Sequence, residues 1–197
     1  RSSDLLANIA CGPHVFGEFE DYSIEISEFD RTAPTLTLDG LLRDTIEVFD
    51  TWVEPGYTAI DLLDGNITAD VTVTNPLDVN VTGSYTIAYE VYDKSGNKAY
   101  KERVIVVQDT ELPTITLNGA DTVYVDVLTS YVEQNATAKD NYDNSPAVII
   151  TGNVDTAVLG NYSVQYCVTD IEGNGPVCIS RVVIVRDIED PIIALKG

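Results

Sequence analysis

Apolar and polar side chains alternate with a period of two over most of this chain. Because successive side chains of a β-strand point to opposite faces of a sheet, the alternation predicts strands with one buried and one exposed face. The predicted strands cover residues 35–38, 45–49, 71–74, 85–93 and 101–107, and then 114–117, 122–127, 147–151, 162–170 and 180–185. No stretch shows helical periodicity over three turns, and Gly, Asn, Asp and Pro gather between the runs, as is typical of tight turns.

The sequence repeats with a period of about eighty residues. FDRTAPTLTLDG begins at Phe29, QDTELPTITLNG at Gln108 and RDIEDPIIALKG at Arg186. Each copy has an Asp, a Pro four residues later and then an alternating apolar run that leads to a Gly. A repeat of this length indicates tandem modules built on one pattern.

The interior of the repeat is duplicated as well. TWVEPGYTAIDLLDGNIT from Thr51 aligns with SYVEQNATAKDNYDNSPA from Ser130, and GSYTIAYEVYDKSGN from Gly83 aligns with GNYSVQYCVTDIEGN from Gly160. We predict an all-β fold of two tandem immunoglobulin-like antiparallel β-sandwiches, with an extra strand segment at each end. The predicted divisions are an N-terminal segment at 1–29, a first repeat at 30–108, a second repeat at 109–186 and a C-terminal segment at 187–197.

The ordered motifs resemble the HYR-like and bacterial Ig-like surface repeats, which occur in tandem in adhesins, surface-layer proteins and algal or protist extracellular proteins. The resemblance rests on D-x-x-x-P, then [YW]-V-E, T-A-x-D-x-x-D and G-x-Y-x-[VI]-x-Y-x-V-x-D-x-x-G-N, and it covers nearly all of residues 30–197. It implies an extracellular module used for spacing or adhesion, and it implies no catalytic residues.

Charge and composition narrow the classes of partner. The chain has 11 Lys and Arg residues against 32 Asp and Glu, a formal net charge of −21, so its surface repels phosphate backbones and nucleic acid is not expected to bind. No apolar run approaches the roughly 20 residues that a transmembrane helix needs, so no membrane span is expected.

Three cysteines are present. Cys167 and Cys178 flank the predicted turn DIEGNGP, where cross-strand neighbours meet, so a disulfide is favoured there over free thiols. The matching positions of the first repeat carry Glu90 and about Tyr100. Cys11 is left over, and it is either an intermolecular cross-link, the partner of a cysteine in a removed segment, or a buried free thiol.

Four N-x-[ST] sequons begin at Asn66, Asn80, Asn135 and Asn161. Chance supplies some sequons in a chain rich in Asn and Thr. Four of them, each near a predicted strand end or turn, favour a secreted eukaryotic glycoprotein that is extracellular or at the cell surface.

Acidic residues recur at fixed positions of each repeat and suggest calcium, which takes six to eight oxygen ligands. The recurring carboxylates include Asp93 and Asp170 in the D-x-x-G-N motif. The predicted ligands are Asp30, Asp61, Asp64, Asp109, Asp140, Asp143 and Asp187. The EF-hand spacing is absent, and solvated acidic loops are the alternative interpretation.

Catalysis is not expected, and neither is any cofactor other than calcium. His14 is the single histidine and precedes both repeats, so a histidine-dependent triad has one candidate base and a zinc site with several histidines is excluded. Carboxylates that recur once per repeat are typical of a role in the fold or the junction rather than of glycoside hydrolysis.

The tyrosines fall mostly on repeat positions. Tyr85 and Tyr162 follow a Gly by two residues, as the corner tyrosine of a sandwich does, and Tyr89 and Tyr166 lie farther along the same strand face. Packing is therefore favoured over stacking on sugars.

Two functions from different classes remain. The first is a structural building block of an extracellular filament, appendage or adhesin stalk, which self-associates head to tail through its modules and terminal strands. The alternative is an adhesion module that binds surface carbohydrate or protein. Ile24 and Ile26 resemble the last strand of an earlier module and PIIAL at 191–195 a first strand, and such strands need partners from other subunits or from a longer array.

Overall fold

The computed structural model describes residues 29–194, which form strands and a single turn of 3-10 helix. We call residues 30–108 the first module and residues 109–186 the second module. The strands of the first module are β1 (Thr35–Leu38), β2 (Arg43–Glu47), β3 (Tyr57–Asp61), β4 (Gly65–Asn66), β5 (Thr72–Thr74), β6 (Gly83–Tyr92) and β7 (Lys98–Gln108), with the 3-10 turn η1 (Thr68–Asp70). One of its sheets has the order β1-β3-β4 and the other the order β2-β7-β6-β5.

The second module repeats this plan. Its strands are β8 (Thr114–Leu117), β9 (Thr122–Asp126), β10 (Ala136–Lys139), β11 (Val148–Thr151), β12 (Gly160–Val168) and β13 (Val177–Arg186). A two-stranded sheet, β10-β8, faces a four-stranded sheet of order β11-β12-β13-β9. The all-β class and the two tandem immunoglobulin-like sandwiches are therefore confirmed.

One strand pair in each module is parallel, which differs from a purely antiparallel sandwich. β2 runs parallel to β7, and β9 runs parallel to β13. The chain leaves β1 or β8 and crosses at once to the other sheet, where the next strand lies beside the last strand of the module. Gly40 (φ +74°) and Gly119 (φ +82°) make this crossing in a conformation that glycine adopts readily, which explains the Gly that ends each repeated motif.

The core of each module lies between its two sheets and is lined by the alternating positions of the long strands. In the first module Ile87, Tyr89 and Ile105 are fully buried, and in the second module Tyr166 and Val183 are. The packing role predicted for Tyr89 and Tyr166 is confirmed.

The predicted corner tyrosines are also confirmed. The Tyr85 hydroxyl donates to the Val81 carbonyl at 2.8 Å, and the Tyr162 hydroxyl donates to the Val158 carbonyl at 2.9 Å. Each bond ties the start of a long strand to the loop before it.

A buried arginine occupies the same place in both modules. Arg181 of β13 is fully buried; its Nε donates to the Ala120 carbonyl at 2.9 Å and its Nη1 to Glu133 Oε1 at 2.8 Å. The Tyr166 hydroxyl donates to the same Glu133 carboxylate. Arg103, Glu54 and Tyr89 form the equivalent group in the first module.

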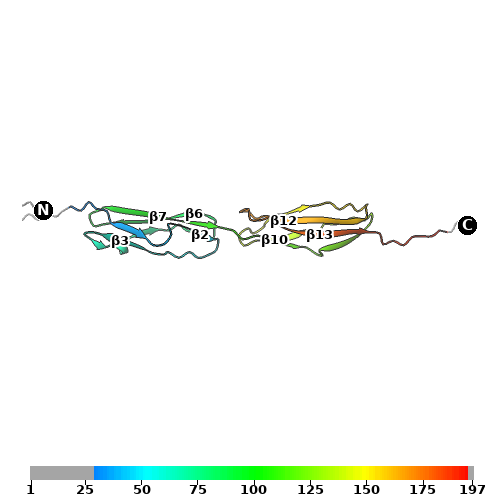
Figure 1. The fold of residues 1–197 in the computed structure, drawn as a ribbon, viewed down its shortest axis with the longest axis horizontal. Helices are drawn as coiled ribbons and strands as arrows, with labels where there is room; N and C mark the ends of the chain where they lie inside the picture. The colour runs from blue at the N-terminus through cyan, green and yellow to red at the C-terminus, as the bar shows by residue number, and fades with distance from the viewer. Residues whose placement is uncertain (1–28, 195–197) are drawn as a thin grey trace, which may run out of the picture.

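The two modules lie end to end along the long axis of the molecule (Figure 1). β7 runs to Gln108, and only residues 109–113 separate it from β8. The N-terminal end of the second module therefore faces the C-terminal end of the first.

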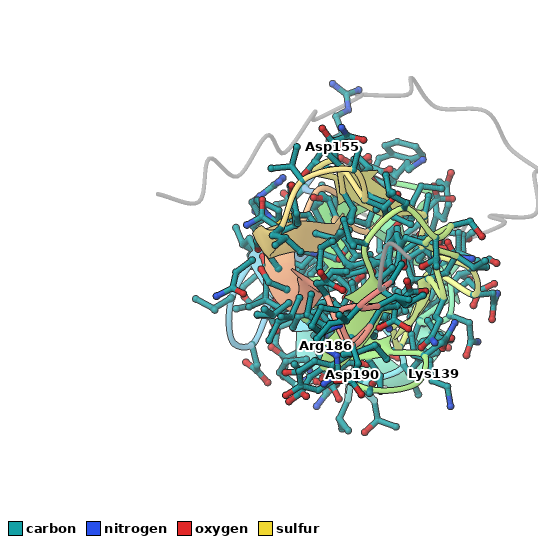
Figure 2. All side chains as sticks on the ribbon, turned by 90° about the vertical axis from the view of Figure 1, so that its right-hand side faces the viewer. Lys139, Asp155, Arg186 and Asp190 are labelled. Carbon is teal, nitrogen blue, oxygen red and sulfur yellow. A yellow bond between two sulfur atoms is a disulfide. The ribbon has the colours of Figure 1, made fainter. Side chains whose placement is uncertain are left out.

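Residues 187–194 leave the second module and pair with no strand within the described range 29–194. Figure 2 looks along the long axis at the C-terminal end of the second module, with Asp155 at the top of the view and Arg186 and Asp190 in its lower half. Ile192 and Ile193 are exposed. The strand expected around Ile24 and Ile26 lies outside the described residues. Over 29–194 there is no helix with the length and apolar character needed to cross a membrane.

Candidate metal centre

Three carboxylates converge at the end of the second module that faces the first. Asp109 follows β7, Asp140 follows β10 and Asp170 follows β12. One oxygen from each lies within 4.8 Å of the others, and Asp109 and Asp170 are more than nine-tenths buried. Strand ends that are far apart in the sequence thus bring three acidic side chains to one point.

Each carboxylate is held by backbone amides of its own loop. Asp140 Oδ2 accepts hydrogen bonds from the amides of Tyr142 at 3.0 Å and Asp143 at 2.9 Å. Asp109 Oδ1 accepts one from the amide of Glu111 at 3.2 Å. These turns are the usual conformation of Asp in loops and fix the direction of the side chain.

The hairpin between β12 and β13 holds the third carboxylate in the same way. Asp170 Oδ1 accepts from the amides of Gly173 at 2.7 Å and Asn174 at 2.8 Å. The Asn174 side chain in turn donates to the Asp109 carbonyl at 3.1 Å. The D-x-x-G-N motif therefore builds a carboxylate site and ties it to the linker.

The second oxygen of each carboxylate has no hydrogen-bond partner. Asp109 Oδ2, Asp140 Oδ1 and Asp170 Oδ2 are all buried and unsatisfied within the described part of the chain. A buried acceptor without a partner costs about 1–3 kcal/mol, and more if it is charged. Three converging carboxylates, each with such an oxygen, are the arrangement that a bound cation would satisfy.

The electrostatics of the cluster differ from one carboxyl to the next. Burial raises the pKa of Asp109 above its ordinary range, and the nearby negative charges of Asp140 and Asp170 act in the same direction. Burial acts in the same direction on Asp170, but the hydrogen bonds from Asn174 and Gly173 outweigh it and lower the pKa of that carboxyl. The ionised form of Asp109 is thus disfavoured, chiefly by burial.

The first module has an equivalent group at its N-terminal end, made of Asp30, Asp61 and Asp93. Asp61 Oδ1 accepts from the amides of Leu63 and Asp64, and its Oδ2 is buried without a partner. Asp93 differs from its counterpart, because Asn97 bonds to both of its oxygens.

The remaining predicted ligands, Asp64, Asp143 and Asp187, belong to neither group. Asp64 forms an ion pair with Lys94, with Nζ to Oδ1 at 2.9 Å, and the hydrogen bonds from Lys94 lower the pKa of its carboxyl. Asp143 Oδ1 accepts from the amide of Ser145 at 3.0 Å, and Asp187 Oδ1 accepts from that of Glu189 at 3.0 Å.

Asp93 and Asp170 complete the two groups, although they were not among the predicted ligands. Their signal in the sequence is an Asp three residues before Gly-Asn in each repeat. In both modules this motif closes the hairpin between the two longest strands, so the turn residues and the carboxylate recur together.

The loops that carry the carboxylates also contact the first module. The Tyr142 ring lies 6.1 Å from that of Phe49, centroid to centroid, and Thr82 Oγ1 lies 3.3 Å from the Tyr142 hydroxyl. Thr82 Oγ1 also donates to Glu172 Oε1 at 3.0 Å. Each loop therefore serves both the acidic cluster and the junction.

Glu47, at the end of β2, also contacts the linker. Its Oε1 accepts from the Thr110 amide at 2.7 Å, and its Oε2 accepts from the Thr110 hydroxyl at 2.8 Å. The first module thus places a fourth carboxylate beside Asp109, and none of these junction contacts was predicted.

The disulfide between Cys167 and Cys178 is present. The two residues are directly opposed in the β12–β13 ladder, with Cα atoms 4.2 Å apart. Glu90 and Tyr100 occupy the equivalent opposed pair of the first module, as expected. Cys11 and His14 lie outside the described residues.

The four sequon asparagines, Asn66, Asn80, Asn135 and Asn161, are exposed on the modules. Glycan attachment at these sites stays a prediction.

Comparison with family models places this architecture among known proteins. The model for the bacterial surface protein Ig-like domain matches twice, over residues 36–107 and 115–185. The chain belongs to this family. The match bears out the bacterial Ig-like part of the expected resemblance and does not single out the HYR-like repeats. Together with the disulfide, it suggests an extracellular or surface location.

Individual proteins similar to this chain share less than a third of its residues. The chain is 29% identical over 163 residues to the pesticidal crystal protein Cry22Aa of Bacillus thuringiensis, covering 79% of this chain and 22% of that protein. Among solved structures, a lipoprotein from Bacteroides thetaiotaomicron is 17% identical with a TM-score of 0.38, covering 76% of this chain and 98% of that one. Fibronectin(III)-like modules of Clostridium thermocellum CbhA are 15% identical with a TM-score of 0.35, covering 82% and 100%.

Proposed function

We propose that this chain is a stiff, non-catalytic building block of an extracellular stalk or filament, in which Ig-like modules are joined head to tail. The observation that carries the proposal is the junction itself. A linker of residues 109–113 leaves little slack, and Phe49, Thr82 and Glu47 of the first module all contact the second module or the linker. A flexible tether would leave these residues free.

The C-terminal end of the second module supports continuation of the array. Asp126 ends β9 as Glu47 ends β2, and Leu128 has the left-handed conformation of Phe49, with φ values of 66° and 71°. Leu128 is 80% exposed, whereas Phe49 packs near Tyr142. The C-terminal end of the second module thus resembles the end of the first module that contacts the second module.

In this proposal a further module, either on the same polypeptide or on another subunit, binds at the C-terminal end of the second module. Asp187 accepts a hydrogen bond from the residue two positions later, as Asp30 and Asp109 do, so the third copy of the linker motif begins with the same turn. Exposed Ile192 and Ile193 then follow, as apolar residues follow the same turn at β1 and β8.

Small-angle X-ray scattering of the full chain tests the stiff arrangement. β7 has 11 residues and β13 has 10, so two modules laid end to end span at least roughly 70 Å at about 3.3 Å per residue. We expect the maximum dimension of the chain to lie in a narrow distribution above that length. Scattering that fits side-by-side or randomly oriented modules would contradict the proposal.

Assembly is tested separately by negative-stain microscopy with intact mass spectrometry under non-reducing conditions. Filaments formed by chains of unit mass support joints between subunits. A strictly monomeric chain that binds a glycan array instead favours the carbohydrate-binding function over the filament.

A further inference from the structure

The acidic cluster at the junction has the composition of a calcium site. Asp109, Asp140 and Asp170 each contribute one oxygen, and these oxygens lie within 4.8 Å of one another. Calcium binds oxygen at about 2.3–2.6 Å, so two ligands on opposite sides of one ion are up to about 5 Å apart. One oxygen of each carboxylate is thus within the reach of a single ion, and each carboxylate also has a buried oxygen without a hydrogen-bond partner.

We propose that a calcium ion binds between Asp109, Asp140 and Asp170 and locks the second module against the first. The binding step is independent of the stalk proposal, whereas its effect on stiffness rests on that proposal.

The ligand set favours calcium over other common cations. The group contains carboxylates alone, without the His or Cys that zinc prefers. Magnesium usually keeps several waters and binds one or two carboxylates, whereas calcium accepts a crowded set of protein oxygens. Calcium needs further oxygens beyond these three, which water and nearby backbone carbonyls can supply.

The carboxylates are oriented before any ion arrives. In Asp140 and Asp170 one oxygen accepts two backbone amides, and the other oxygen is buried without a hydrogen-bond partner. Hydrogen bonds of this kind fix the direction of a ligand and strengthen metal binding. The loops therefore need little rearrangement to bind the ion.

The ion would connect three segments that already meet the first module. Asp140 lies two residues from Tyr142, and Asp170 lies two residues from Glu172. Asp109 adjoins Thr110, which Glu47 holds from the first module. Fixing the three carboxylates at one point therefore fixes both loops and the linker against the first module.

The group in the first module serves as an internal comparison. It has the same three positions, but of its oxygens only Asp61 Oδ2 is buried without a partner among the described residues. The junction group has three such oxygens and is accordingly the stronger site.

The binding experiment is a calcium titration of the ¹⁵N-labelled full chain in metal-free buffer. Amide signals of Tyr142, Asp143, Gly173 and Asn174 should shift and saturate, because these amides bond to the ligand carboxylates. Magnesium chloride at equal ionic strength should shift them far more weakly. Unshifted signals at saturating calcium would overturn the site without reliance on any variant.

The matched variants are Asp170→Asn and Asp155→Asn. Asp155 accepts the Ala157 amide at 2.9 Å in a similar turn, away from the acidic groups, so its change controls for the loss of one charge. Asp170→Asn keeps an acceptor for the loop amides, and we expect about tenfold or greater loss of calcium affinity at these signals. Equal affinity in the two variants would refute the ligand assignment.

The effect on stiffness is read from residual dipolar couplings of both modules, with calcium and with chelator. We expect one common alignment with calcium and divergent alignments without it. Calcium binding with independent modules would refute the lock and count against the stiff stalk. An extended chain that binds no calcium would refute this inference alone.

Discussion

At the scale of single residues, one buried charge network connects the parts of each module. Arg181 donates to backbone carbonyls of the β8–β9 connection and to Glu133, which lies before β10. A buried guanidinium is costly to desolvate, so the folded module is stable only when the acceptors of that guanidinium are in place. The carboxylate of Glu133 supplies a charge that balances it.

Glu133→Gln should destabilise the second module by about 2 kcal/mol. The value is below the 3–5 kcal/mol typical of a fully buried pair, because Glu133 is partly exposed. Urea unfolding followed by far-ultraviolet circular dichroism measures the loss. Glu189→Gln, in the exposed C-terminal segment, is the control, and equal stability of the two variants would contradict the role of the pair.

The buried tyrosines predict a loss of stability at high pH. Burial and then the hydrogen bond to Glu54 raise the pKa of Tyr89 from about 10 to about 12, and burial and Glu133 raise the pKa of Tyr166 as well. The folded state thus favours the neutral phenols, so their contribution is complete below pH about 10 and is lost as the pH rises towards about 12.

This pH dependence is measured by unfolding at a series of pH values alongside tyrosinate absorbance. We expect Tyr89→Phe to weaken the fall in stability of the first module. Full ionisation of the tyrosines near pH 10 in a chain that is still folded would contradict the prediction.

The sequence predicts residues whose role is local and misses those whose role depends on distant partners. Tyr85 and Tyr162 could be assigned as corner residues because a nearby Gly marks the position. Arg103 and Arg181 leave a signal, a charge in a Val-rich run at the same place in each repeat, but their acceptors come from loops about sixty residues away. Alternation alone cannot name those acceptors.

At the scale of elements, the β12–β13 hairpin has the longest strand ladder of the second module. Nine opposed residue pairs join the two strands, and the disulfide links the eighth of them. In the first module the ladder of β6 and β7 is one pair longer and has no cross-link. The disulfide therefore adds stability to a hairpin that the fold already specifies.

Replacing both cysteines, Cys167→Ser with Cys178→Ser, should lower the stability of the second module by about 2–3 kcal/mol. The cross-linked residues are 11 apart in sequence, and closing so short a loop removes a limited amount of unfolded-state entropy. Trp52 is the only tryptophan and packs on the first core, so its fluorescence should show no change in the first module. An equal loss in the Trp52 transition would contradict the assignment.

Strand positions were predictable where alternation is clean. The runs at 35–38 and 114–117 are β1 and β8, residue for residue. β3 and β10 were missed because they directly follow irregular segments; Asn135, just before β10, has φ +63°. The parallel pairing of β2 with β7 was also missed, since the direction of a partner strand leaves no trace in local alternation.

At the scale of the whole molecule, the junction decides whether two modules act as one rod. The aromatic pair Phe49 and Tyr142 and the polar contacts of Thr82 lie on one side of the linker, and Glu47 holds Thr110 within it. Because each module has its own core, these contacts affect orientation far more than folding.

Tyr142→Ala should loosen the junction while leaving both modules folded. The change removes the ring beside Phe49 and the hydroxyl beside Thr82, so the modules should align independently in residual dipolar couplings and the scattering distribution should broaden. Tyr142 is only partly buried, so unfolding free energies should change by less than about 1 kcal/mol.

Tyr142→Phe separates the two contributions, because it keeps the ring and removes the hydroxyl. If aromatic packing dominates, this variant retains the common alignment, and if the bonds with Thr82 dominate, it behaves like Tyr142→Ala. Asn141→Ala, an exposed neighbour in the same loop, is the control for disturbance of the loop itself. An unchanged alignment in Tyr142→Ala would contradict the role of Tyr142 and assign the orientation to the contacts that remain in every variant, those of Glu47 with the linker and of Thr82 with Glu172.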